Sequence, residues 1–187
     1  LKAEKNQTPE VILSLAGHFF LGKPELHPQE AVAANMLAGR VAYENYASQD
    51  ALGFLKQAKT LSDRLSVKLD KAFHVLISLA HARLDQFPEA IESQAKALEF
   101  VKDPIQRAEV FAELARLYQL NLELDKSWDS AVKGFSELGI NLNAPGIIQA
   151  FDALRSYLFG LFIELTGLFV GTGSEKKKEY YRVAAYI

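Results

Sequence analysis

A pattern of small residues occurs three times along this chain, and it constrains the fold more than any other feature. In each occurrence a small residue is followed by two more, 12 and 19 positions later, with a more varied residue at offset 16. The sets are Gly39, Ala51, Leu55 and Ala58; Ser78, Ala90, Gln94 and Ala97; and Ala115, Ser127, Ala131 and Gly134. A small residue at offset 0 lets a second helix approach closely, and offsets 12 and 19 lie on that second helix. The pattern therefore predicts antiparallel helix pairs that stack on one another.

The helix-start signals and the absence of alternating apolar and polar residues predict an all-α fold. Thr8-Pro9 and Asp103-Pro104 each combine an N-cap residue with proline at the first helical position. We expect about nine helices in a right-handed array, with helices over 28–47, 49–62, 68–84, 88–101 and 104–121, and another that follows Asp125 and ends near Gly139. Gly139 followed by Ile140 is typical of a glycine C-cap.

The expected organisation has three parts. An N-terminal helix within 1–27 ends a preceding repeat or caps the array. Three repeats follow over 28–142, divided as 28–66, 67–103 and 104–142. An apolar helix and a terminal helix occupy 143–187 and continue the array. We interpret the chain as a piece of a longer protein, because it begins at Leu1 without a signal peptide and ends at Ile187 within a helical pattern.

The segment from Ile147 to Val170 is the most apolar part of the chain. Asp152, Arg155 and Glu164 interrupt it, whereas a transmembrane helix needs about 20 mostly apolar residues. We therefore expect no membrane insertion, and expect a helix buried on most sides or exposed as a docking face. That face could support self-association, and its residues would be Leu154, Phe159, Leu161, Leu168 and Val170.

Charge and cysteine content limit the classes of partner. The chain of 187 residues has a formal net charge of −2, so no overall field attracts nucleic acid, and we expect no nucleic-acid partner. The sequence contains no cysteine, which excludes disulfides and thiolate metal sites and favours a reducing compartment, the cytoplasm.

The repeats resemble tetratricopeptide repeats. The second repeat carries the resemblance most clearly, in the segment from Ala82 to Ile91 followed by Ala95-Lys96-Ala97-Leu98, and the third keeps Tyr118. The position that usually holds Trp carries Asn35, His74 and Phe111. Long repeats of this kind are similar to those of large bacterial signalling ATPases, kinases and transcription regulators, on the segments Ala38-Gly39-Arg40 with Tyr43, Lys133-Gly134-Phe135 and Leu138-Gly139-Ile140. The resemblance implies a right-handed α-solenoid that serves as a protein-interaction scaffold.

The sequence carries no catalytic constellation, so we expect no enzyme activity and no cofactor. The loop Gly171-Thr172-Gly173-Ser174 lacks the Gly-Lys-Ser/Thr ending of a phosphate loop. His74 and His81 lie seven residues apart on one helix, which is two turns and too far for one metal ion. We therefore expect no metal site and interpret both histidines as inter-helix packing residues.

A ligand of stacked helix pairs would lie against the first helix of each pair. Positions one and four after each small residue face that groove, and the next position lies at its edge. The candidate binding residues are Arg40, Tyr43, Glu44, Arg83, Arg116 and Gln119, with Leu79 and Ala82 at the matching positions of the second repeat. The arginines could hold carboxylates of an acidic protein or peptide, because guanidinium forms bidentate bonds with them.

Three functions agree with these features. The first is a protein-interaction module or an intramolecular scaffold that binds a protein segment or flanking domains. The second is a small-molecule sensor, which would need a closed, aromatic-lined groove. The third is a structural spacer or dimerisation element that uses the apolar 147–170 helix.

Overall fold

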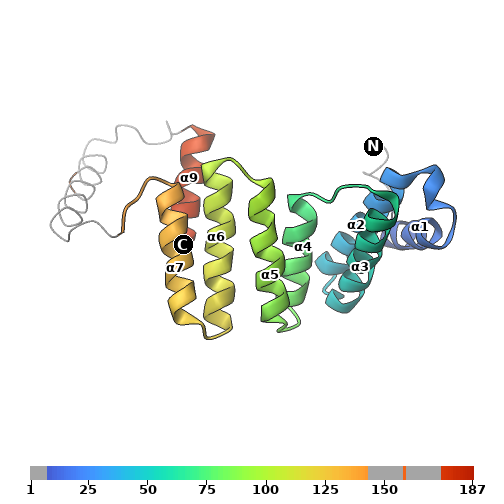
Figure 1. Ribbon diagram of the computed structural model, residues 1–187, viewed down its shortest axis with the longest axis horizontal. Helices are drawn as coiled ribbons and strands as arrows, with labels where there is room; N and C mark the ends of the chain where they lie inside the picture. Colours follow the sequence, from blue (N-terminus) through green and yellow to red (C-terminus); the bar gives the residue numbers. More distant parts are fainter. Residues whose placement is uncertain (1–7, 143–157, 159–173) are drawn as a thin grey trace. The chain divides into compact units, whose positions relative to one another are not determined.

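The computed structural model describes residues 8–142, 158 and 174–187, and within these residues it contains helices and no strand. Two short 3-10 helices, η2 (Pro24–Leu26) and η3 (Leu98–Phe100), accompany the α-helices. The α-helices are α1 (Pro9–Leu21), α2 (Pro28–Glu44), α3 (Ser48–Leu65), α4 (Lys71–Ala82), α5 (Phe87–Ala97), α6 (Pro104–Leu120), α7 (Leu124–Glu137) and α9 (Glu175–Tyr186) (Figure 1). The chain divides into two compact units, Leu1–Val101 and Lys102–Ile187. The expected all-helical fold is confirmed for the described residues.

Consecutive helices pack in pairs, as the small-residue pattern predicts. In the first unit α2 packs along α3 and α4 packs along α5, and in the second unit α6 packs along α7. The residues at offsets 0 and 12 lie where each pair is closest. The Ser78 hydroxyl donates to the Ala90 carbonyl oxygen at 2.8 Å, and the Ser127 hydroxyl donates to the Ala115 carbonyl oxygen at 2.9 Å. Side chains larger than serine at these positions would separate the two helices.

The three pairs share one turn geometry. Tyr46, Asp85 and Leu122 follow the first helix of each pair, and each has a positive φ of about 60°. The next amide N–H donates to a carbonyl oxygen five residues earlier, for example from Ala47 to Ala42 at 2.9 Å. This is the hydrogen bond of a Schellman motif, which usually has glycine at the left-handed position.

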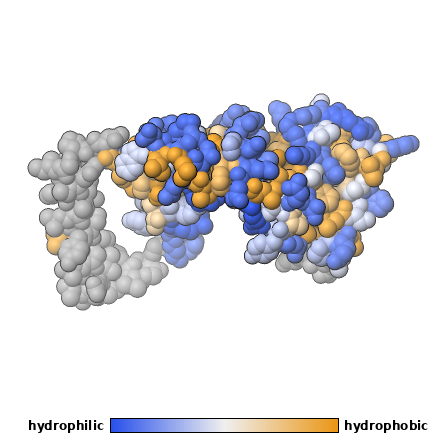
Figure 2. Space-filling view, turned by 90° about the horizontal axis from the view of Figure 1, so that it is seen from below, coloured by the Kyte–Doolittle hydropathy of each residue, from blue (hydrophilic) through white to orange (hydrophobic). Residues whose placement is uncertain are grey.

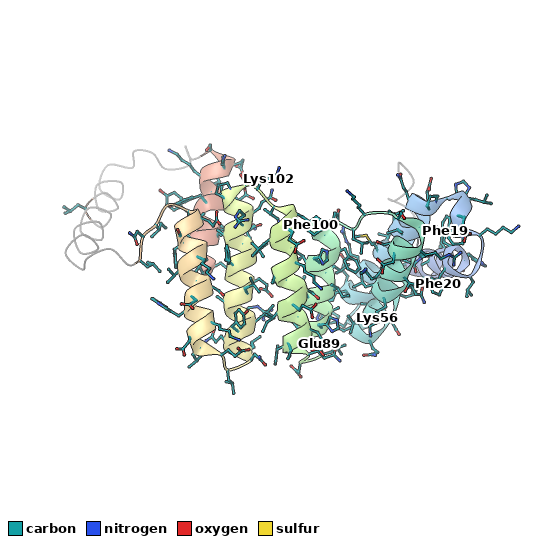
Figure 3. The ribbon with its side chains drawn as sticks, in the orientation of Figure 1. Phe19, Phe20, Lys56, Glu89, Phe100 and Lys102 are labelled. Carbon is teal, nitrogen blue, oxygen red and sulfur yellow. The ribbon has the colours of Figure 1, made fainter. Side chains whose placement is uncertain are left out.

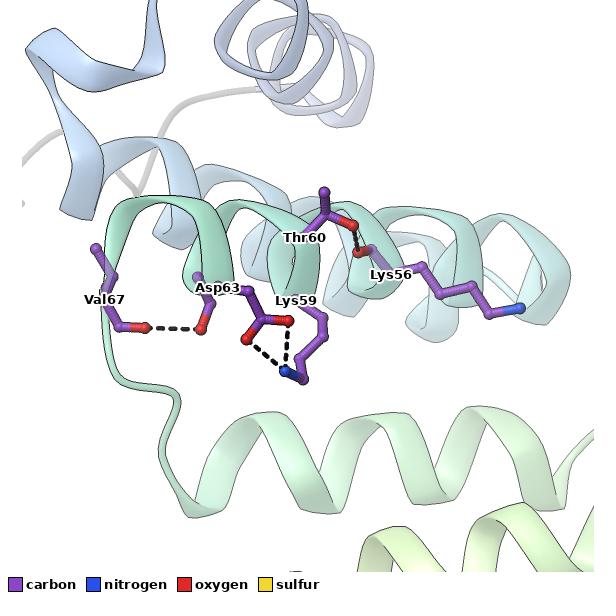
Figure 4. A network of polar contacts seen from close by, with 6 residues as sticks. Lys56, Lys59, Thr60, Asp63 and Val67 are labelled. Carbon is purple, nitrogen blue, oxygen red and sulfur yellow. Dashed lines mark hydrogen bonds and ion pairs between the residues drawn. The ribbon is translucent and has the colours of Figure 1, made fainter.

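The ends of α2 and α3 differ from those expected from the sequence. Helix α2 ends at Glu44, three residues early, because Tyr46 enters the left-handed region. Helix α3 extends to Leu65 and ends where Ser66 adopts a φ of 55°. The Ser62 hydroxyl then donates to the Val67 carbonyl oxygen at 2.7 Å (Figure 4).

Other helix ends follow their local capping groups. Helix α4 begins at Lys71 rather than 68, because the Asp70 carboxylate accepts a hydrogen bond from the Phe73 amide at 3.2 Å. Helix α5 ends at Ala97, before the expected 101, where the chain tightens into η3. Gly139 has a φ of 76°, so the expected glycine C-cap is confirmed.

The core of the first unit lies between successive helix pairs. Leu52 and Leu55 of α3 pack with Phe73, Leu76 and Ala80 of α4. A neighbouring cluster brings Phe19 and Phe20, at the end of α1, against the buried side chains of Ala31, Val32 and Leu61 (Figure 3). The first unit is therefore held together by apolar side chains between α1 and α2 and between α3 and α4.

Helix α9 packs on the α6–α7 pair in the second unit. Its buried Val183 joins a cluster with Ile105, Ala108 and Leu138. The Tyr180 hydroxyl donates to the Leu138 carbonyl oxygen at 3.1 Å. Residue Ser174 caps the start of α9, as expected for the final helix.

The apolar segment 147–170 falls almost entirely outside the described residues. Its docking-face residues Leu154, Phe159, Leu161, Leu168 and Val170 are all outside them, so self-association through that face stays a prediction. Among the helices that the structure describes, none has the length and apolar character needed to cross a bilayer.

Enlarging a residue at a helix contact should destabilise the protein. Ala51 and Ala90 are completely buried, so Ala51→Leu or Ala90→Leu should lower the free energy of unfolding by about 1–3 kcal/mol through overpacking. The control Glu92→Gln alters an exposed side chain paired with Lys96 and should change the free energy of unfolding by less than about 0.5 kcal/mol. Urea unfolding followed by circular dichroism measures both. Equal midpoints for the alanine variants and the control would mean that these positions are not close contacts.

Candidate interaction groove

A groove of about 580 Å³ runs between α2 and the start of α4 in the first unit. Residues from the second half of α2 form one wall, and α4 with its N-cap forms the other. The lining residues are Arg40, Tyr43, Glu44, Asp70, Lys71, Ala72, Val75, Leu76 and Leu79. Three of the candidate residues, Arg40, Tyr43 and Glu44, therefore share one groove, together with Leu79.

The groove combines an apolar floor with a charged rim. Ala72, Val75, Leu76 and Leu79 recur on α4 at spacings of three and four residues, so they present one face of the helix to the groove. Two basic and two acidic residues stand around this face: Arg40, Glu44, Asp70 and Lys71. Such a surface can bury apolar side chains of a ligand while its rim contacts the ligand's polar groups.

Arg40 is the basic rim residue best placed to bind an anion. Its side chain is exposed at the groove, and it forms no ion pair with any of the described residues. Its position on α2 directly after Gly39 places it beside the close contact between α2 and α3. A guanidinium there is held by a rigid helix and can form a bidentate bond with a carboxylate.

Arg83 supports the groove instead of lining it. Its guanidinium carbon lies 3.6 Å from the centre of the Tyr43 ring, and Nη1 donates to the Tyr43 carbonyl oxygen at 2.6 Å. A cation over an aromatic face is an attractive arrangement. Arg83 therefore ties the end of α4 to α2 and fixes the Tyr43 ring at the edge of the groove.

Arg116 and Gln119 lie in the second unit, in a different groove. The Arg116 guanidinium is already paired with Glu113, through Nε to Oε2 at 3.0 Å and through Nη2 to Oε1. The hydrogen bonds to Glu113 raise the pKa of Arg116. Burial and Glu113 likewise raise the pKa of Tyr186, whose hydroxyl donates to Oε2 at 3.0 Å. Arg116 is thus held in a network of polar contacts with Glu113 and Tyr186, all within the second unit.

The start of α4 forms a part of the groove that the sequence-based prediction does not include. Asp70, Lys71 and Ala72 line the groove but lie six to eight residues before Ser78, whereas the predicted groove positions all follow a small residue. The signal was present, because Ala72, Val75, Leu76 and Leu79 already form a stripe at helical spacing.

The two histidines of α4 make separate contacts. The His74 ring stacks on Phe100 with centroids 5.1 Å apart, and His81 Nδ1 lies 2.7 Å from Gln86 Oε1. Among the described residues no group of histidine or acidic side chains could hold a metal ion.

His74 should make stability depend on pH. Burial, and then Lys96, lower its pKa from the ordinary value of about 6.5, against smaller opposing effects of Glu99 and Asp70. At a pH below about 6.5, His74 binds a proton more readily in the unfolded state than in the folded state. The stability of the fold therefore falls as the pH falls from about 6.5 towards the lowered pKa. Urea unfolding at pH 7.5 and 5.0 should show a larger loss for the native chain than for His74→Phe, which keeps the stacking on Phe100. The same loss in both proteins would show that His74 does not contribute.

Comparison with known proteins adds no family assignment. No protein-family model matches the chain, and no curated protein matches it.

Proposed function

We propose that this chain is a protein-interaction module built from tetratricopeptide-like helix pairs, and that the α2–α4 groove receives an extended protein segment. The observation that carries the proposal is the groove itself, with an apolar floor and with Arg40 on its rim unpaired among the described residues. The repeat pattern and the paired helices suit a scaffold of stacked pairs in a right-handed solenoid.

The segment that fits this groove carries both apolar and acidic side chains. Apolar side chains would lie on Ala72, Val75 and Leu79, while a carboxylate would pair with Arg40. Because both signs of charge are present at the rim, the partner needs at least one acidic group and not a strongly acidic sequence. The segment could come from another protein or from a flanking part of the same polypeptide.

The groove suits a protein segment better than a small effector. Small-molecule sites bury most of the ligand in a closed and largely apolar pocket, whereas this groove is open along two helices and has four charged rim residues. By resemblance we place the module in a larger signalling protein, and the absence of cysteine suits the reducing cytoplasm.

Site-specific photo-crosslinking tests the proposal. A photo-reactive residue at Ala72 should form crosslinks to a protein in cell extract, and Arg40→Glu should reduce their yield at least about fivefold by replacing attraction with repulsion. Lys56→Glu is the matched control, because it makes the same change of charge at an exposed residue of α3 that lies away from the groove (Figure 3). It should leave the yield unchanged.

A second position distinguishes the groove from the outer surface. Glu89 lies on an exposed part of α5 and does not line the groove (Figure 3). Crosslinks that form from Glu89 and not from Ala72, or that are insensitive to Arg40→Glu, would refute the α2–α4 groove as the binding site.

A further inference from the structure

Arg40 and Glu44 are two opposite charges on the α2 wall of the α2–α4 groove, and they do not pair with each other. Both side chains are exposed and line the groove, and neither forms an ion pair with any of the described residues. Lys59 and Asp63 have the same spacing on α3 and do pair, with Nζ 2.5 Å from Oδ1 (Figure 4). Arg40 and Glu44 are therefore both available to a ligand.

The spacing of these two charges suits an extended segment. Residues four apart on a helix lie on one side of it, separated by about 6 Å along the axis. In an extended chain every second side chain points to the same side, and these side chains are about 6.6 Å apart. A segment that lies along α2 can therefore place one side chain opposite Arg40 and the next but one opposite Glu44. An acidic residue suits the first position and a basic residue suits the second.

The side chain between these two charged residues of the segment faces α4. Neighbouring side chains of an extended segment point in opposite directions, so the middle one points from α2 towards the other wall. The end of α4 lies beside the end of α2, since Arg83 contacts Tyr43. Leu79 and Arg40 lie four and three residues before these two, and both line the groove. An apolar middle side chain therefore packs on Leu79 and on its neighbour Val75.

Arg83 fixes the last turn of α2, which carries Glu44. Its Nη1 donates to the Tyr43 carbonyl oxygen at 2.6 Å, one of the carbonyl groups at a helix end that have no partner within the helix. This hydrogen bond ties the last turn of α2 to α4, so the distance between Arg40 and Glu44 is set before a ligand arrives. Groups held in place in this way lose little conformational freedom on binding.

We propose that the α2–α4 groove binds a partner segment in which an acidic and a basic residue flank one apolar residue. This inference rests on the proposed function of the groove and names the chemistry of the segment. The carboxylate pairs with Arg40, the basic side chain pairs with Glu44, and the apolar side chain packs on Val75 and Leu79. The surface of the first unit is mixed in the same way, since Figure 2 shows hydrophobic and hydrophilic side chains next to one another there. A purely acidic segment would set a like charge against Glu44.

Selection of random peptides displayed on phage tests this chemistry. Peptides retained by the native full chain should share an apolar residue with an acidic residue on one side and a basic residue on the other. Glu44→Arg gives the groove two basic side chains, so this variant should select an apolar residue between two acidic residues. Asp63→Arg is the matched control, because it reverses an exposed carboxylate on α3, outside the groove. It should select the same peptides as the native chain.

A fluorescently labelled synthetic peptide, with the sequence most often selected by the native chain, measures the size of the effect. It should bind Glu44→Arg at least about fivefold more weakly than it binds the native chain, because attraction becomes repulsion. Its affinity for Asp63→Arg should stay within about twofold of the native value. A second peptide, with the basic residue replaced by glutamate, should regain affinity for Glu44→Arg. A variant that had simply lost its fold would bind neither peptide.

Three results would overturn this inference. The first is native-selected peptides with acidic residues alone, which would mean that Glu44 contacts no ligand. The second is charges four positions apart, which would indicate a helical segment. The third is a crosslink in the free chain from a photo-reactive residue at Ala72 to a segment outside α1 to α5, which would assign the groove to the chain itself.

The photo-reactive residue at Ala72 also separates this inference from the proposed function. In the first two cases the selected peptides still crosslink from Ala72 and lose yield with Arg40→Glu, so the groove remains the binding site and only the chemistry of the segment is wrong. If no peptide is selected, or if none of the selected peptides crosslinks from Ala72, the proposed function fails together with this inference.

Discussion

Leu55→Ala should lower the free energy of unfolding by about 2–5 kcal/mol, one of the largest losses available in this chain. The Leu55 side chain, on α3, is fully buried against α2 and α4, in a cluster that includes Leu52, Phe73 and Leu76. Shortening its side chain removes apolar contacts and leaves a cavity that rigid helices cannot close. Chemical denaturation of the purified chain measures the loss.

A second substitution, at Gly39, tests whether the contact between Gly39 and Leu55 sets the distance between α2 and α3. A Cβ at Gly39 would lie 2.9 Å from Leu55 Cγ, closer than real Cβ contacts, so Gly39→Ala alone should cost about 1–3 kcal/mol. In the Leu55→Ala background the obstructing atoms are gone, and the same change should gain up to about 1 kcal/mol of helix propensity. The prediction is therefore a change of sign in the double-mutant cycle. Equal costs in both backgrounds would mean that Gly39 is not required for close packing.

Asn35→Asp should destabilise the protein by about 3–5 kcal/mol at pH 7, because it introduces an unpaired charge into the core. Asn35 is completely buried, and its amide nitrogen donates to the carbonyl oxygens of Ala16 and Ala31 at 3.3 and 2.9 Å. An aspartate there would face two oxygen acceptors. Asn35→Leu, which removes both hydrogen bonds without adding charge, is the matched control and should cost about 1–2 kcal/mol.

The pH dependence identifies the cause of this loss. Burial raises the pKa of an aspartate at position 35 in the folded state above its unfolded value. The charge penalty is therefore present at pH 7 and disappears as the pH falls through that raised pKa. The gap between Asn35→Asp and Asn35→Leu should narrow between pH 7 and pH 4, when the protonated acid can donate to the Ala31 carbonyl oxygen. A gap that is constant over this range would contradict the charge explanation.

The pairing of helices could be predicted because it depends on side-chain size, which the sequence states directly. Gly39, Ser78 and Ala115 lie at the close contacts, and two serines even hydrogen-bond across them. The ends of α2 and α3 could not be predicted, because the left-handed positions are held by Tyr46 and Ser66 instead of glycine. There the hydrogen bonds of the turn outweigh the local preference of the residue.

The candidate groove was predicted in part for a similar reason. Arg40 and Tyr43 follow from their helical offset to Gly39, whereas Asp70 and Lys71 contribute because α4 begins beside α2, which is a tertiary relation. The pairing of Arg116 with Glu113 was readable, since residues three apart on a helix are neighbours. The pattern of small residues identified which side of the first helices faces a groove. Whether an arginine on that side can bind a ligand depends on whether a neighbouring carboxylate already pairs with it.

The shared turn at Tyr46, Asp85 and Leu122 has a consequence for how the chain reaches its fold. Each turn is closed by a hydrogen bond between residues only five apart, and the contact of each pair joins residues only 12 apart. Such short loops cost little entropy to close, and proteins rich in local contacts fold quickly. Every helix pair can therefore serve as a starting point for folding, and the order of assembly need not follow the order of synthesis.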